Sequence, residues 1–162
     1  MTNAITAIRD HLARALDWED AHVAFDGALA GIPLDKQGAA APGFEHTLWQ
    51  LLEHIRIAQR DILDFCRDPH YAHTMRWPQD YWPREPAPQV PDAWTASVAS
   101  YRHDREALKG VALDTSDLTA LVPTGKGTQT YLRAILLTVD HTAYHVGQIV
   151  ALRRALGVWP GA

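Results

Sequence analysis

The stretch "TQTYLRAILLTVDHTAYHVGQIVALRRAL" (residues 128–156) shows the fold class of this chain most clearly. Its apolar residues return every three or four positions, which is the period of an α-helix with one buried face. Gly157 and Pro160 follow it and are typical stop signals. The sequence therefore predicts one long helix over residues 128–156.

Three other segments carry the same period and are predicted to be long helices: residues 3–16, 46–67 and 93–110. Asp92 is placed to cap the third of these, and Gly110 to end it. A shorter helical piece is predicted at 21–30, with Asp17 or Asp20 as its cap. No segment alternates as a strand does, so we predict an all-α protein folded as a four-helix bundle.

A proline-rich stretch, residues 68–92, separates the second and third long helices and holds six prolines in 25 residues. It cannot form a regular helix, and a connection of this length is usually functional or disordered. Its aromatic residues argue against disorder. We predict an ordered crossover that covers one end of the bundle, with Trp77 or Trp82 near a functional pocket or a neighbouring subunit. The alternative is that these side chains only plug the end of the bundle.

The composition excludes several classes of protein. The chain has 162 residues, 47% of them hydrophobic, and a formal net charge of −4, which predicts a single domain over residues 1–162 with a sizeable core. Lysine and arginine form no run, so we expect no nucleic-acid partner. No segment approaches the roughly 20 apolar residues that cross a bilayer. One cysteine and no signal-peptide pattern predict a cytoplasmic protein without an internal disulfide.

Two histidines, His141 and His145, lie four residues apart in the last predicted helix and therefore share a face, one turn apart. Both fall at the edge of the apolar stripe. With this spacing one helix can offer two imidazole nitrogens to one metal ion. The alternative is that both histidines only form hydrogen bonds to neighbouring helices.

A metal ion on this pair needs a third ligand from another helix, and His46 and His54 compete for that role. They lie eight residues apart, about 12 Å along a helix, so both cannot bind the same ion. His54 flanks the apolar stripe of its helix, whereas His46 points nearly opposite, and we therefore predict His54 as the ligand. Asp61, two turns further on, is placed to orient a ligand or reach a substrate, unless it only pairs with an arginine.

The other histidines and the cysteine receive simpler interpretations. We predict His11, His22 and His103 to be surface or hydrogen-bonded core residues, and Cys66 to be a small core residue. His70 and His73 lie in the proline-rich stretch, from which they can approach the site.

Two familiar motifs are incomplete in this chain. "TGKGTQT" (residues 124–130) resembles a phosphate-binding loop, but Ala120 replaces its first glycine, Gly127 follows its lysine, and no strand precedes it. The zinc-protease motif is also excluded, because Thr142 follows His141 where that motif has glutamate.

Three segments together resemble the DinB/YfiT-like superfamily of metal-dependent enzymes: "WQLLEHIRIAQRDIL" (49–63), "WPQDYWP" (77–83) and "GTQTYLRAILLTVDHTAYHVGQIVALRR" (127–154). The resemblance covers nearly the whole chain. It implies a four-helix bundle in up-down-down-up order, and a homodimer. It also implies a divalent metal ion, zinc or nickel before iron or manganese, on His54, His141 and His145.

Members of that superfamily include transferases and isomerases that use mycothiol, bacillithiol or glutathione, and others are described as hydrolases. Three neutral imidazoles leave coordination positions open, as a catalytic site requires. A bound ion lowers the pKa of water or of a thiol. No glutamate lies within the histidine pair to act as a base, which favours thiol-dependent chemistry on a small electrophile over hydrolysis, with support from Asp61 and Gln148. A non-catalytic binding or dimerisation module is the remaining alternative.

Overall fold

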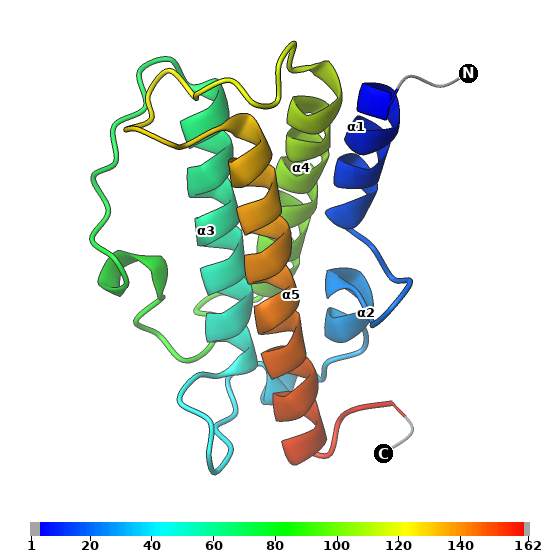
Figure 1. Cartoon of the computed structure of the whole chain (residues 1–162). Helices are drawn as coiled ribbons and strands as arrows, with labels where there is room; N and C mark the ends of the chain where they lie inside the picture. Colours follow the sequence, from blue (N-terminus) through cyan, green and yellow to red (C-terminus); the bar gives the residue numbers. More distant parts are fainter. Residues whose placement is uncertain (1–3, 161–162) are drawn as a thin grey trace.

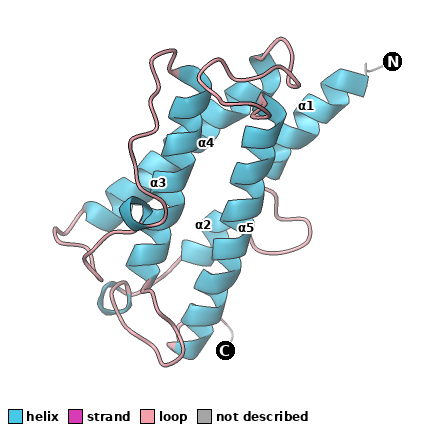
Figure 2. Cartoon of the chain, turned by 60° about the vertical axis from the view of Figure 1, so that its left-hand side comes forward, coloured by secondary structure: helices cyan, strands magenta, loops and turns pink. Residues whose placement is uncertain are grey.

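The computed structural model describes residues 4–160, and its regular secondary structure within that range is helical. Figure 2 shows the helices and the long connections between them. The α-helices are α1 (Ala4–Ala15), α2 (Phe25–Leu29), α3 (Leu48–Arg67), α4 (Ala93–Asp114) and α5 (Tyr131–Ala155). Two short 3-10 helices, η1 (Leu34–Lys36) and η2 (Gln79–Tyr81), lie in the connections. The prediction of an all-α fold is confirmed.

Four of these helices form a bundle. In Figure 1, α1 and α5 run downward, whereas α3 and α4 run upward, which is the predicted up-down-down-up order. The helix α3 packs against both α4 and α5, and α1 packs against α4. The short helix α2 packs against the second half of α5. The parallel pair α3 and α4 needs a connection that returns along the whole bundle.

Side chains from facing helices fill the interior of the bundle. Leu52 and Ile55 of α3 meet Ile149 and Leu152 of α5 in one apolar cluster, and all four side chains are fully buried. A second cluster, which includes Leu108 of α4, joins α1 to the opposite end of the bundle. The burial of these apolar surfaces is the main force that holds the helices together.

The caps of α3 and α5 explain why both helices begin later than predicted. Thr47 caps α3, because its hydroxyl accepts the backbone N–H of Gln50 while the Gln50 side chain accepts the backbone N–H of Thr47. The predicted start at His46 is therefore wrong by two residues. In the same way the Thr130 hydroxyl accepts the N–H of Arg133, so α5 begins at Tyr131 and not at Thr128.

The predicted start of α4 after Asp92 is confirmed, whereas its predicted end at Gly110 is wrong. The helix α4 continues through Gly110 to Asp114, because an isolated glycine weakens a packed helix without ending it. Asp92 precedes α4 but its side chain accepts no capping hydrogen bond.

The second helical segment is shorter than predicted. It begins only at Phe25, so neither Asp17 nor Asp20 caps it. The Asp17 carboxylate instead pairs with the Lys109 ammonium of α4 at 2.6 Å.

The proline-rich crossover (residues 68–92) returns along the side of α3 (Figure 1). It is bonded to that helix at several levels. The Thr47 hydroxyl donates to the carbonyl of Pro86 at 2.5 Å, and the Gln50 amide donates to the carbonyl of Pro83 at 3.3 Å. The prediction of an ordered cover is confirmed, but the predicted place over one end of the bundle is wrong.

Candidate metal centre

Three histidines from two helices converge between α3 and α5. His54 of α3 and His141 and His145 of α5 each offer one ring nitrogen, and these nitrogens lie within 4.8 Å of one another. The ring centroids form a nearly equilateral triangle with sides of 4.8, 4.5 and 4.5 Å. The structure thus brings together the three residues that the sequence pattern selected.

The backbone of the crossover fixes the tautomer of His54. Its Nδ1 lies 2.9 Å from the carbonyl oxygen of Tyr81, and a carbonyl can only accept, so Nδ1 carries the hydrogen. The Nε2 atom of His54 therefore holds a free electron pair. It lies 3.0 Å from Nε2 of His141.

A side chain one turn further along α5 fixes His145. The Nδ1 atom of His145 donates to Oε1 of Gln148 at 2.7 Å, and the Gln148 amide group donates to the Tyr144 hydroxyl at 3.4 Å. This arrangement leaves Nε2 of His145 as the available nitrogen. Hydrogen bonds from the second ring nitrogen commonly orient histidine ligands in metal sites. Gln148, predicted as a supporting residue, contacts His145.

An aromatic stack covers one side of the cluster. The Trp82 ring stacks on His54 with centroids 3.8 Å apart and planes parallel within 1°. The other face of Trp82 stacks on His46 at 3.7 Å. His46 precedes the cap of α3, so the helical geometry that predicted it to point away does not apply. The histidine cluster is shielded by a His46–Trp82 layer, and the predicted nearness of Trp82 is confirmed.

Trp77 lies at the outer edge of the same site. Its ring centroid is 6.2 Å from that of His54, and its side chain is 63% exposed. It also contacts Tyr81 edge-on at 5.1 Å. Trp77 is therefore close to the cluster without closing it.

Asp61 anchors the crossover to α3. One carboxylate oxygen accepts the hydroxyl of Tyr71 at 2.8 Å and the other accepts the hydroxyl of Tyr81 at 2.5 Å. These contacts and burial raise the pKa of both tyrosines above the usual range. Among the described residues, the ion-pair contact of Asp61 is with His73 at 3.8 Å and not with an arginine. Asp61 acts on His54 through Tyr81, whose carbonyl holds the imidazole.

The environment keeps the three imidazoles neutral. Burial lowers the pKa of His54 to about 4, and the nearby His145 and His46 add to this effect. Burial, with His145 and His54 close by, lowers the pKa of His141 to about 4. The pKa of His145 is also lowered by burial. Neutral imidazole is the form that binds a metal ion.

The donor set fits a divalent ion of the zinc or nickel type. Two nitrogens that bind one zinc ion tetrahedrally at about 2.0–2.1 Å are about 3.3 Å apart, close to the 3.0 Å between His54 and His141. Imidazole ligands suit zinc, copper, iron and nickel better than magnesium or calcium. Three histidines leave coordination positions free for other molecules.

The remaining predicted residues lie outside the cluster. His73 contacts the Tyr71 hydroxyl at 3.0 Å and therefore belongs to the Asp61 anchor. The side chains of four other histidines are exposed: His11, His22, His70 and His103. Cys66 is buried, as predicted, and burial raises the pKa of its thiol to about 12.

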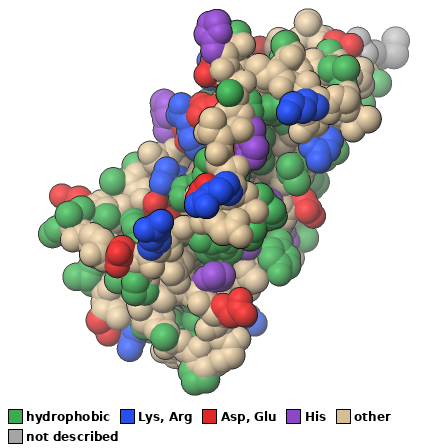
Figure 3. All heavy atoms as spheres, turned by 90° about the vertical axis from the view of Figure 1, so that its left-hand side faces the viewer, with side chains coloured by type: hydrophobic (Ala, Val, Ile, Leu, Met, Phe, Trp, Pro, Cys, Tyr) green, Lys and Arg blue, Asp and Glu red, His purple; other side chains and the backbone are tan. Residues whose placement is uncertain are grey.

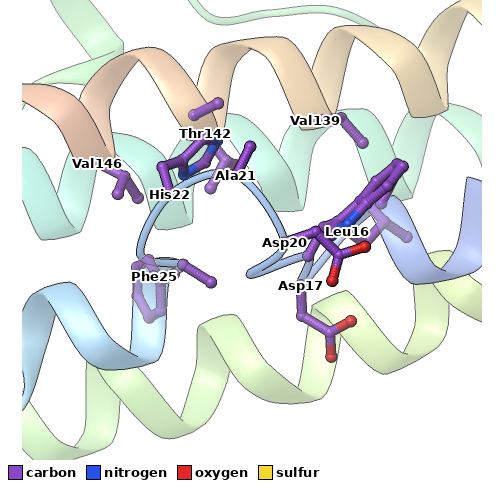
Figure 4. A pocket seen from close by; sticks show the side chains of 13 residues that line it. Leu16, Asp17, Asp20, Ala21, His22, Phe25, Val139, Thr142 and Val146 are labelled. Atoms are coloured by element: carbon purple, nitrogen blue, oxygen red, sulfur yellow. The ribbon is translucent and has the colours of Figure 1, made fainter.

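The hollows beside α5 include one on the linker side and one on the crossover side. An apolar cavity of about 240 Å³ lies between the α1–α2 linker and α5 (Figure 4), where Leu16, Phe25 and Val146 surround it. None of the three clustered histidines lines this cavity. A larger pocket of about 800 Å³ lies on the crossover side and includes Asp61 and Leu137.

The charged side chains on the crossover face are mixed. Figure 3 looks onto this face and shows basic and acidic groups interspersed, with histidines between them. No helix within the described range has the length and apolar character that crossing a bilayer requires. The face offers no continuous basic track for a nucleic acid.

Comparison with known proteins identifies a family. The family model for the DinB superfamily matches residues 17–149. This range contains all three clustered histidines and the crossover. No curated protein and no solved structure matches the chain.

Proposed function

The chain belongs to the DinB superfamily, and from this membership and the histidine cluster we propose that it is a metal-dependent enzyme acting on a small molecule. The observation that carries the proposal is the convergence of Nε2 of His54 on Nε2 of His141, 3.0 Å apart, with Nδ1 of His54 held by a backbone carbonyl. Since burial keeps both imidazoles neutral, two ring nitrogens this close together are suited to share one metal ion.

Each surrounding residue has a distinct part in this proposal. His54, His141 and His145 hold the ion, which when bound lowers the pKa of a thiol or water and polarises an electrophile. Tyr81 and Gln148 hold the imidazoles of His54 and His145 in the binding tautomer. The other ligand, His141, is the only partly exposed one of the three, so substrates approach from its side.

Thiol-dependent transfer or isomerisation of a small electrophile is the preferred reaction class. Hydrolysis commonly needs a general base that activates the attacking water, and two carboxylates of α3 that could serve are engaged elsewhere. Asp61 accepts two tyrosine hydroxyls, and Glu53 pairs with Arg56 at 2.7 Å. A thiol is acidic enough for the ion alone to convert it to thiolate. Metal-dependent hydrolysis is the second candidate.

We further propose a cytoplasmic homodimer. Leu136 and Tyr144 of α5 expose 49% and 65% of their surface, which supports contact with another chain. The buried, unpaired Cys66 suits a reducing compartment. Sedimentation of wild type and Leu136→Glu tests the dimer; a wild-type monomer at micromolar concentration contradicts it.

Metal analysis tests the site itself. Protein purified without a nickel column and then loaded with zinc is expected to hold one ion per chain, whereas His54→Ala and His141→Ala hold almost none. His103→Ala, on the exposed side of α4, is the matched control and should bind as wild type. Equal zinc content in all four proteins contradicts the proposed site.

Turnover separates the reaction classes. A panel of small electrophiles is offered to the zinc-loaded protein with mycothiol, bacillithiol, glutathione or no thiol. Thiol-dependent turnover that is lost in His141→Ala supports the transferase proposal, and turnover at the same rate without thiol supports hydrolysis. The alternative is that the histidines only form hydrogen bonds between the helices. In that case His145→Ala lowers the melting temperature of the metal-free protein, and the wild type consumes no substrate.

A further inference from the structure

A pocket of about 800 Å³ lies on the crossover side, and its lining includes none of the three clustered histidines. We call it the basic pocket, and its walls are the crossover at Tyr71 and His73, the loop before α5, and the first turns of α5. Leu137 lines it one helical turn before His141, about 6 Å along the axis. A molecule in this pocket can therefore extend to the histidine cluster.

Two cations lie on its walls without an acidic partner. Lys126 and Arg133 both line the pocket. The arginines Arg102 and Arg105 of α4 pair with Asp26, whereas neither Lys126 nor Arg133 forms an ion pair with a described carboxylate. The one carboxylate in the lining is Asp61, so two cations stand against one anion and the charge of the lining is positive. The pocket therefore favours an anion.

The loop that carries Lys126 is held in place by its own hydrogen bonds. The backbone N–H of Lys126 donates to the Gln129 side chain at 2.7 Å, and the backbone N–H of Val122 donates to the Gln129 carbonyl at 2.9 Å. Thr124 donates to the carbonyl of Phe65 in α3 at 3.1 Å. A side chain at Gly125 would meet the Val122 carbonyl at 3.0 Å. The "TGKGTQT" segment is thus a fixed loop that places a lysine at the pocket.

The lining also contains apolar surface. Ile62 and Phe65 of α3 and Ala134 and Leu137 of α5 contribute to it. Arg133 lies eight residues before His141, about 12 Å along α5. This separation matches a small organic molecule better than an inorganic ion.

We propose that the basic pocket binds the anionic end of the substrate, a carboxylate or a phosphate, through Lys126 and Arg133. The apolar body of the substrate then lies along Leu137 with its reactive end at His141. The substrate class is a small organic anion whose charged group lies about 12 Å from the reacting atom. This inference rests on the proposed function for the reaction, but the anion site itself can be tested without it.

The first test measures binding to metal-free protein by amide NMR. The probes are 4-phenylbutyrate and phenyl phosphate, with 4-phenylbutan-1-ol as the uncharged match of the first. Both anions are expected to shift amides of residues 124–137, and the alcohol to bind about tenfold more weakly. Equal binding of acid and alcohol, or shifts confined to other regions, overturns the proposal. The two anions separate carboxylate from phosphate preference.

Charge-removing variants locate the site. Arg133→Gln and Lys126→Gln are each expected to weaken binding of 4-phenylbutyrate by roughly fivefold, and the double variant by tenfold or more. Arg154→Gln removes the same charge about 30 Å further along α5 and should bind as wild type. Unchanged binding in the double variant overturns the proposal. All variants should still bind zinc, since none of these side chains belongs to the histidine cluster.

A second test gives the orientation of the bound molecule. In cobalt-loaded protein, the phenyl protons of bound 4-phenylbutyrate should relax faster than the protons beside the carboxylate, because the phenyl end lies nearer to the ion. The reverse order overturns the proposed direction. Absence of cobalt binding, with anion binding intact in the first test, would count against the proposed metal function and leave the anion site standing.

Discussion

Two connections lie beside the helical bundle, the crossover along α3 and the α1–α2 linker beside α5, and they differ in how they are held. The crossover is bonded to α3 at Thr47, Gln50, His54 and Asp61. The α1–α2 linker lies over an apolar cavity of about 240 Å³ (Figure 4), and its His22 imidazole bonds only to the neighbouring carbonyl of Val23. One connection positions polar groups, whereas the other covers apolar surface.

This difference indicates on which side of α5 the fold contains groups that lower its stability and serve a function. On the crossover side, two buried imidazoles and one partly buried imidazole converge, and burial lowers the pKa of each. Burying a group that can carry a charge costs stability unless the group stays neutral or finds a partner. On the linker side, the apolar hollow costs packing energy, and the His22 side chain in its lining is exposed. Perturbed titratable groups cluster at functional sites, which supports our proposal that the site lies on the crossover side.

The largest expected effect is metal-linked stabilisation on the crossover side only. Zinc at about 1,000 times its dissociation constant should stabilise the wild type by about 4 kcal/mol, because the ion binds the folded state alone. His145→Ala should show no such gain. Calorimetry with and without zinc measures both.

The neighbouring residue of α5 supplies the control. Val146→Ala removes a buried side chain that faces the linker cavity, so it should lose about 1 kcal/mol and keep the full zinc response. If zinc stabilises His145→Ala as much as Val146→Ala, the assignment of the two sides is wrong.

The next largest effect is expected from the Asp61 anchor. Asp61→Ala leaves the hydroxyls of Tyr71 and Tyr81 without their acceptor, and should cost roughly 2–3 kcal/mol. Since Tyr81 holds His54, zinc affinity should also fall by about tenfold or more. Urea unfolding and zinc titration check the two parts.

Asp64→Ala is the matched control, because Asp64 pairs with Arg60 in an exposed ion pair of the same helix. It should change stability by about 1 kcal/mol at most and leave zinc affinity unchanged. A loss of stability in Asp61→Ala without any loss of zinc affinity would restrict Asp61 to anchoring the crossover.

The sequence predicted those features that depend on helical periodicity. His54, His141 and His145 were selected because they lie at the edges of apolar stripes, and the stripes set how α3 and α5 face each other. The helix ends were less predictable, because a threonine cap depends on one local hydrogen bond. Thr47 and Thr130 moved two predicted starts by two or three residues.

Contacts that involve the crossover could not be read from periodicity. A proline-rich segment has no repeat that fixes which residue meets which. The stacking of Trp82 between His46 and His54, and the bond from His54 to the Tyr81 carbonyl, arise from the path of the chain. The density of aromatic residues in the segment signalled that it is ordered, but not that it runs along α3.

A smaller effect is expected from pH in the metal-free protein. His54 and His141 have a pKa of about 4 in the fold and about 6.5 when unfolded. Between these values the unfolded chain binds more protons, so stability is full above pH 6.5 and falls as the pH falls toward 4. Each such histidine contributes a slope of up to about 1.4 kcal/mol per pH unit.

Urea unfolding at pH 7 and pH 6 measures this loss, which should be about 1–2 kcal/mol for the wild type. In His54→Gln the loss should be smaller, because one of the two groups is gone. His103→Gln, which is exposed on α4, should behave as wild type. An equal loss in all three proteins would mean that the histidine cluster does not set the acid sensitivity.

The smallest effect is expected on the linker side, where the cavity can be filled. Ala143 of α5 lines the cavity and is partly buried, so Ala143→Leu places three more carbons in a space of about 240 Å³ without changing helix propensity much. Stability should rise by about 0.5–1 kcal/mol, while zinc affinity stays as in wild type because the cavity contains none of the three histidines. Thermal unfolding and zinc titration of this variant address both sides of α5 at once. A fall in zinc affinity would show that packing under the linker is coupled to the histidine cluster, and that the two sides of α5 do not act independently.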